Sequence, residues 1–155
     1  MKTHDYTATV AWTGNRGEGT AHYKAYDRTW QVETPGKPVI ACSNDPLLGG
    51  DPSRPNPEDL LLSSLSACHM LWYLHYASDA GIVVHDYRDE PVGLGQAGPG
   101  GAGRFLSATL RPVIKVARGA DLLKAEDIHH QIHKVCFIAR SVNFPVSYAP
   151  RFIEV

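Results

Sequence analysis

The chain has 155 residues, of which 43% are hydrophobic and 20% charged, and its formal net charge is −1. This composition excludes a disordered polar chain, and the near-neutral charge argues against nucleic acid as a partner. A chain of this length buries roughly 70% of its unfolded surface on folding, so we expect a single domain spanning residues 1–155.

The amino terminus, MKTHDYTATV, lacks the apolar segment of a secretory signal, so a cytoplasmic location is the default expectation. Three cysteines are an odd number and argue against a disulfide scaffold. The uncharged stretch 60–78 contains four serines and two histidines, which are costly in hydrocarbon. We therefore expect it to be a buried helix of a soluble protein, with no membrane partner.

Alternating apolar and polar residues predict strands in the first third of the chain. Residues 4–13 alternate, and GNRGEG (14–19) follows with three glycines that suit a hairpin. Further strands are predicted at 20–27, 28–34 and 39–42. The segment 43–56 is rich in Pro, Gly, Asp and Asn, which predicts a loop.

A long helix is predicted over residues 57–80 by the signals at its two ends. Asn56 suits the N-cap, Pro57 the first helical position, and Gly81 the stop. Apolar residues fall on nearly all faces of this segment, so the helix must be buried on most sides. One chain of this size has little material to cover it, which indicates a core shared between two subunits.

The second half of the chain predicts further strands and one more helix. A strand is predicted at 83–91, and the six glycines of 93–103 predict a hairpin connection, because neither phosphate-loop spacing is present. A strand follows at 105–117, with Pro112 marking an edge or bulge. Apolar residues at helical spacing predict a helix over 122–142, and the chain closes with a strand at 145–154. This order predicts an α+β fold.

Three segments together resemble the OsmC/Ohr family of thiol peroxidases: PNPEDLLLSSLSACH (55–69), HKVCFIARSVNFPV (133–146) and GNRGEGT (14–20). The resemblance implies antiparallel sheets around two central helices in an intertwined homodimer. It implies reduction of organic hydroperoxides, with Cys68 as the peroxidatic thiol and Cys136 as the resolving thiol. Arg16 and Glu58 would tune Cys68. The implied reductant is a dithiol, and no metal or flavin is implied.

This chemistry depends on the ionised thiol. A free thiol has a pKa near 8.5, so only about 3% is thiolate at neutral pH, and a nearby guanidinium favours the thiolate. Attack on a peroxide leaves a sulfenic acid on Cys68, which Cys136 converts to a disulfide. If 57–80 is one helix, Glu58 and Cys68 lie about 15 Å apart along its axis. We therefore expect Glu58, together with Arg16, to reach Cys68 of the partner subunit.

The segments also depart from the family pattern. His69 stands where Phe often follows the first cysteine, and Phe137 stands where Pro usually follows the second. Adjacent helical residues face different directions, which limits what His69 does for Cys68. Cys42 matches no motif and is interpreted as structural. Trp72, Tyr73, Phe137 and Phe144 are candidates to line an apolar pocket for an organic substrate.

Other interpretations remain open at this point. His129, His130, His133 and Cys136 have spacings that can place metal ligands on one helical face. Glu58 also suits a helix N-terminus in its own right, and Arg16 suits an exposed hairpin tip. A serine hydrolase is disfavoured because no GxSxG segment is present. The alternative function is a non-enzymatic binder of a small apolar ligand or metal on the same fold.

Overall fold

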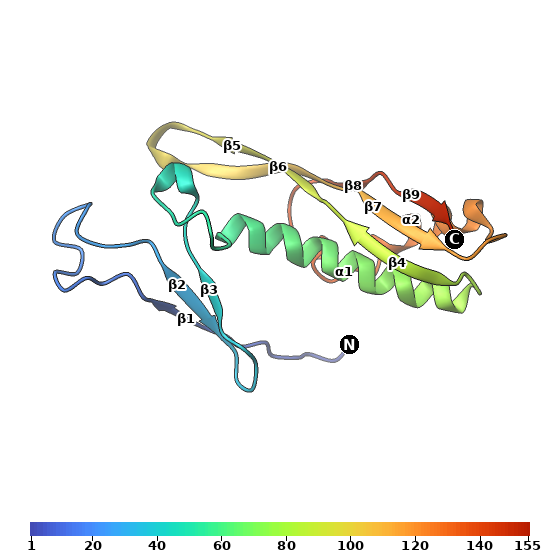
Figure 1. Ribbon diagram of the computed structural model, residues 1–155, viewed down its shortest axis with the longest axis horizontal. Helices are drawn as coiled ribbons and strands as arrows, with labels where there is room; N and C mark the ends of the chain where they lie inside the picture. Colours follow the sequence, from blue (N-terminus) through green and yellow to red (C-terminus); the bar gives the residue numbers. More distant parts are fainter. The chain divides into compact units, whose positions relative to one another are not determined.

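The computed structural model describes all 155 residues and divides into two compact units, Met1–Leu60 and Leu61–Val155. Helix α1, Pro57–Asp79, begins in the first unit and continues into the second (Figure 1). No helix has the length and apolar character needed to cross a membrane. Helices and strands are both present, which confirms the predicted α+β class.

The first unit is built on a small antiparallel sheet with the order β1-β2-β3. Its elements are β1 (Thr9–Trp12), β2 (Trp30–Glu33), β3 (Ile40–Cys42) and the short 3-10 helix η1 (Pro46–Leu48). The strands predicted at 28–34 and 39–42 are confirmed in this sheet. The strand predicted at 4–13 is shorter than expected and includes only its last residues.

The strand predicted at 20–27 is wrong, because this segment belongs to a loop that is closed by a single bridge between Asn15 and Tyr26. Backbone carbonyls that a strand would use in pairing accept hydrogen bonds from arginine side chains instead. Arg28 donates to the carbonyls of Tyr23 and Tyr26, and Arg16 donates to that of Ala25. The alternation of the segment therefore does not lead to a strand.

Helix α1 begins as the sequence predicts. The Asn56 side chain accepts from the Asp59 N–H at 2.8 Å, and the Asp59 carboxylate accepts from the Asn56 N–H at 3.1 Å. This reciprocal capping satisfies two backbone donors at the helix start. At the other end Gly81 has a φ of 72°, the left-handed conformation that favours glycine after a helix. Within the chain, only one stripe of the helix is buried: Leu65, His69, Tyr73 and Ala77.

The second unit contains two three-stranded sheets, with the orders β4-β7-β9 and β5-β6-β8. Their strands are β4 (Val84–Asp89), β5 (Val92–Ala97), β6 (Gly103–Leu110), β7 (Pro112–Val116), β8 (Val146–Tyr148) and β9 (Arg151–Glu154). The glycine-rich segment forms β5 and the connection to β6, which includes the 3-10 turn η2 (Pro99–Gly101).

Two details of these sheets differ from the prediction. The segments 105–117 and 145–154 each form two strands rather than one, since β6 ends before Pro112 and β8 ends before Pro150. The pairs β6–β8 and β7–β9 are parallel, so the sheets are mixed rather than purely antiparallel. The connection between β7 and β9 contains the second helix, as parallel neighbours require a crossover.

Helix α2 spans Leu122–Ile132 and is shorter than the predicted 122–142. The chain then continues in turns to the 3-10 helix η3, Ala139–Ser141. The turns still contain short-range backbone bonds, such as Cys136 N–H to the Ile132 carbonyl at 2.8 Å. Apolar spacing close to that of a helix therefore persists beyond the true helix end, and Cys136 lies after α2 rather than on it.

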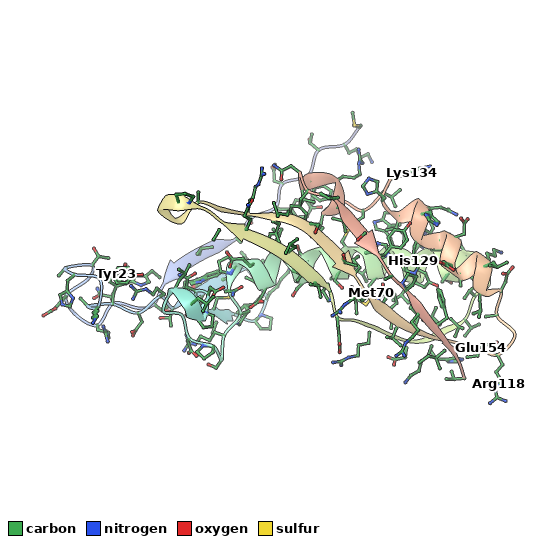
Figure 2. The ribbon with its side chains drawn as sticks, turned by 90° about the horizontal axis from the view of Figure 1, so that it is seen from above. Tyr23, Met70, Arg118, His129, Lys134 and Glu154 are labelled. Atoms are coloured by element: carbon green, nitrogen blue, oxygen red, sulfur yellow. The ribbon has the colours of Figure 1, made fainter.

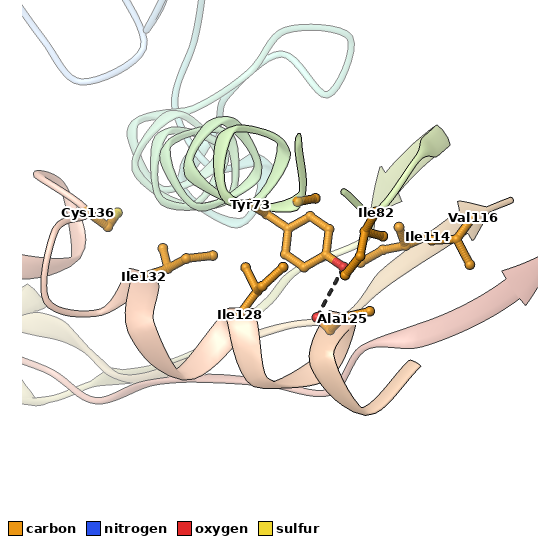
Figure 3. Close-up of a cluster of buried hydrophobic side chains, with 9 residues drawn as sticks. Tyr73, Ile82, Ile114, Val116, Ala125, Ile128, Ile132 and Cys136 are labelled. Carbon is orange, nitrogen blue, oxygen red and sulfur yellow. Dashed lines mark hydrogen bonds between the residues drawn. The ribbon is translucent and has the colours of Figure 1, made fainter. Parts of the chain in front are cut away.

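The core of the second unit lies between α1, α2 and the sheet that contains β7. Figure 3 shows Tyr73 of α1 directed at α2, where its hydroxyl donates to the Ala125 carbonyl at 3.1 Å. Ile114, Val116, Ile128 and Ile132 are at most 3% exposed in the same cluster. Cys136 lies at one end of it (Figure 3). This packing fixes both helices next to the segment that carries the second cysteine.

Candidate functional site

The two cysteines singled out in the sequence lie together in the second unit. The Sγ atoms of Cys136 and Cys68 are 2.8 Å apart, and the Cys136 thiol donates to the Cys68 sulfur. Cys68 comes from α1, and Cys136 comes from the turn after α2. Both cysteines are free thiols, and 68 positions of sequence separate them. Such proximity between distant positions is the arrangement that a reversible disulfide requires.

The two thiols have different surroundings. Cys68 is half-buried at the margin of the core cluster, whereas Cys136 has no exposed surface. Burial raises the pKa of the Cys136 thiol to about 11, and its hydrogen bond to Cys68 acts in the same direction. The Ala139 N–H, 3.4 Å from the Cys136 sulfur, opposes this shift but does not outweigh it. Cys136 therefore remains a protonated donor at neutral pH.

Next to the cysteines is a buried pair of histidines that the sequence did not predict. His69 Nε2 and His129 Nδ1 are 2.7 Å apart, so one imidazole donates to the other. Burial lowers the pKa of His69 to about 4 and that of His129 to about 3. Both rings are therefore neutral at physiological pH. His69 lies on the buried stripe of α1, while Cys68 beside it is only half-buried.

A sequence signal for the buried position of His129 did exist. Ala125, Ile128, His129 and Ile132 follow the spacing of one helical face, and all four are buried. Figure 2 labels His129 on α2, and its ring stacks on Tyr73 of α1 and Tyr148 of β8. Of the three histidines proposed as metal ligands in this segment, only His129 lies on the buried face, whereas His130 and His133 are exposed.

The proposed metal ligands do not converge. His129 is paired with His69, the His130 Nδ1 atom lies 2.6 Å from the Tyr148 hydroxyl, and His133 is exposed. No group of three or more His, Cys, Asp or Glu side chains in the structure is arranged to hold a metal ion. The thiol of Cys136, the fourth candidate, is hydrogen-bonded to the Cys68 sulfur.

Arg16 and Glu58 both belong to the first unit. The Arg16 guanidinium donates to backbone carbonyls of Lys24 and Ala25 and lies 3.7 Å from the Asp27 carboxylate. It thus helps to close the loop that follows β1. Glu58 lies exposed in the first turn of α1, where the helix dipole stabilises a negative charge. A role for either residue beside Cys68 stays a prediction.

The residues suggested for an apolar pocket have separate surroundings. Tyr73 is fully buried in the core, and Phe144 packs on Phe105 with ring centroids 5.4 Å apart. Trp72 packs on Tyr76 and His75, while Phe137 is 61% exposed next to Cys136. Cys42, interpreted as structural, is fully buried in β3, and burial raises the pKa of its thiol.

The first unit also contains an open depression of about 720 Å³ that the sequence did not indicate. Its lining is mainly polar and includes Arg28, Arg54, Asp27 and Asp51. Arg54 pairs with Asp51 at 3.3 Å, and Arg28 lies over the rings of Tyr23 and Tyr26. The charged groups of this depression therefore already have partners.

The fold and the cysteine pair together define a protein of the OsmC class. The family model described as OsmC-like protein matches residues 50–149, so this chain belongs to the OsmC-like family. The match includes Cys68, Cys136 and Glu58 but not Arg16. The resemblance stated from the sequence is confirmed, and so is the OsmC-like fold of the single chain, whereas the implied homodimer stays a prediction.

Solved structures show the same fold along nearly the whole chain. An OsmC-like protein of unknown function from Vibrio cholerae is 27% identical, with a TM-score of 0.85, and the match covers 96% of this chain and 99% of that one. An organic hydroperoxide resistance protein from Legionella pneumophila is 21% identical, with a TM-score of 0.66 and coverage of 99% and 100%. Another from Elizabethkingia anophelis is 20% identical, with a TM-score of 0.68 and complete coverage of both chains. Among curated proteins, none matches this chain.

Proposed function

We propose that this protein is a thiol peroxidase that reduces organic hydroperoxides and is itself reduced by a dithiol. The observation that supports this proposal most strongly is the 2.8 Å approach of the Cys136 and Cys68 sulfurs. Membership of the OsmC-like family agrees with it, since two structures of this fold are named as organic hydroperoxide resistance proteins.

The reaction begins at Cys68, because it is the less buried thiol of the pair. Its thiolate attacks the terminal oxygen of the hydroperoxide, and the O–O bond breaks. The departing alkoxide takes up a proton and leaves as an alcohol, and Cys68 is oxidised to the sulfenic acid. The donor hydrogen bond from Cys136 stabilises negative charge on the Cys68 sulfur as this step begins.

Cys136 then completes the oxidation. Its sulfur attacks the Cys68 sulfur, the S–S bond forms, the S–O bond breaks, and the hydroxide leaves with the thiol proton as water. A dithiol such as dihydrolipoamide restores the two thiols by successive thiol–disulfide exchange and is oxidised to its own disulfide. A reducing cytoplasm, as expected from the sequence, maintains such dithiols.

The proposed active form is a homodimer. Outside its buried stripe, α1 carries apolar side chains that the chain itself leaves partly or largely exposed, among them Leu61, Leu62, Met70, Leu71 and Leu74. Leu71 alone is 63% exposed. A second copy would bury this surface and would bring Arg16 and Glu58 of the partner subunit to Cys68. Arginine there would favour the thiolate and stabilise the departing alkoxide.

The test is consumption of tert-butyl hydroperoxide in the presence of dihydrolipoamide. We expect turnover by the wild-type protein and by Cys42→Ser, the matched control for loss of a thiol, and none by Cys68→Ser. Wild-type protein without turnover would overturn the proposed function and would favour a non-enzymatic binder on the same fold. Turnover by Cys68→Ser would assign the reaction to another group.

A further inference from the structure

The His69–His129 pair is enclosed by aromatic rings, and the proposed reaction does not use it. The two imidazoles are nearly parallel, with centroids 5.0 Å apart. Tyr73 stacks on His129 at 4.5 Å, and Tyr148 stacks on it at 5.3 Å. The Tyr148 hydroxyl is in turn hydrogen-bonded to the Nδ1 atom of His130. Each ring is thus held in position from several sides, which keeps the two bonded ring nitrogens facing each other.

The pair joins the two parts of the chain that carry the cysteines. His69 follows Cys68 directly on α1. His129 lies in the last turn of α2, and the Cys136 N–H donates to Ile132 at the end of that helix. A slide or rotation of α1 against α2 would therefore separate the sulfurs and break the histidine bond at the same time. The Nε2 atom of His129 is buried without a partner, so Nδ1 makes its only hydrogen bond.

We infer that the hydrogen bond between His69 and His129 is a positioning device, which holds α1 against α2 so that the Cys68 and Cys136 sulfurs lie within reach of each other. The inference rests on the proposed function for its purpose, since that reaction requires a disulfide between these cysteines. His69 and His129 are positioning residues here, because they act through the helices that carry the two thiols. The neutral state of both buried rings agrees with this role, since a pair of charged rings would repel.

The experiment measures the equilibrium between the two thiols and the Cys68–Cys136 disulfide in glutathione buffers, by intact mass after acid quench and alkylation. Each disulfide formed reduces one oxidised glutathione to two glutathione molecules, so the equilibrium constant gives the effective concentration of one thiol at the other. All variants carry Cys42→Ser, which removes the third thiol. No peroxide is present, so this measurement and peroxide turnover fail independently.

We expect His69→Leu and His129→Leu each to lower the effective concentration about tenfold, the scale of one lost buried hydrogen bond. His69→Gln and His129→Asn place an amide near the lost nitrogen and should restore most of it. The double variant His69→Leu/His129→Leu has no unpaired nitrogen, so it serves if either single variant fails to fold. Wild-type values in the double variant, or no disulfide in the wild-type protein, would overturn the inference.

Discussion

The Cys136 sulfur is completely buried and lies 2.8 Å from the Cys68 sulfur, which belongs to a residue that remains partly accessible. A disulfide bond is about 2.05 Å long, so little movement separates the thiol pair from a bonded one. The asymmetry in burial also orders the proposed reaction. A peroxide can approach Cys68 from solvent, whereas Cys136 is placed to react only with Cys68.

This order predicts different products in the two cysteine variants. After one equivalent of tert-butyl hydroperoxide without reductant, the wild-type mass should fall by about 2 Da, as two thiols become a disulfide. Cys136→Ser should instead gain about 16 Da, because the Cys68 sulfenic acid has no partner thiol. Intact mass spectrometry distinguishes these outcomes. Oxygen addition to Cys136 in the Cys68→Ser variant would contradict the order.

The buried histidines predict a loss of stability in mild acid. The pKa of His69 is lowered to about 4, mainly by burial, while the nearby Asp89 carboxylate on β4 opposes the shift. An unfolded histidine has a pKa of about 6.5, so between these values only the unfolded chain takes up the proton. The buried, neutral His69 therefore leaves the free energy of unfolding at its full value above pH 6.5. As the pH falls from 6.5 toward 4, proton uptake by the unfolded chain lowers the free energy of unfolding.

The full difference for His69 corresponds to about 3 kcal/mol. His129 acts in the same direction, since burial and the neighbouring His69 and His130 lower its pKa to about 3. Urea unfolding across this pH range measures the effect. The control is His69→Leu/His129→Leu, which retains the surface carboxylates and should lose this part of the pH dependence. An identical pH profile for the two proteins would refute the assignment to the histidines.

The parts of the fold that were predicted correctly have local causes. The start of α1 follows from Asn56, Pro57 and Asp59, which are adjacent in sequence and need no distant partner. The cysteine pair was predicted only because the flanking segments resemble a family. The histidine pair joins residues 60 positions apart, and no local pattern around either histidine indicates that the other is its partner.

The parts that were missed depend on contacts made after folding. Apolar spacing continued past Ile132, and nothing local distinguishes the turns that carry Cys136 from a longer α2. The parallel pairing of β7 with β9 depends on a crossover and is not encoded in either strand. Residues 20–27 alternate between apolar and polar like a strand, but several of their backbone carbonyls accept hydrogen bonds from arginine side chains instead of from a neighbouring strand.

Two neighbouring tyrosines, Tyr73 and Tyr87, predict different responses to loss of the hydroxyl. Tyr73 donates to the Ala125 carbonyl, so Tyr73→Phe should lower the free energy of unfolding by about 1 kcal/mol. The Tyr87 hydroxyl is buried without a partner, so Tyr87→Phe should leave stability unchanged or increase it. The rings lie 5.7 Å apart and each variant serves as the control for the other. Urea unfolding at neutral pH tests the pair, and an equal loss in both variants would contradict the prediction.

The proposed supply of Glu58 by the partner subunit predicts complementation between two inactive proteins. Ten residues along a helix correspond to about 15 Å, which is too far for Glu58 and Cys68 of one α1 to meet. Cys68→Ser and Glu58→Gln should therefore each lose activity as homodimers. A mixed dimer would contain one site with both Cys68 and Glu58 intact and one site with neither, so it should recover about half of the wild-type rate.

The two chains would be purified together through different tags, and turnover of tert-butyl hydroperoxide measured. Absence of recovery in a confirmed mixed dimer would contradict the supply of Glu58 by the partner subunit, and full activity of Glu58→Gln alone would remove Glu58 from the reaction.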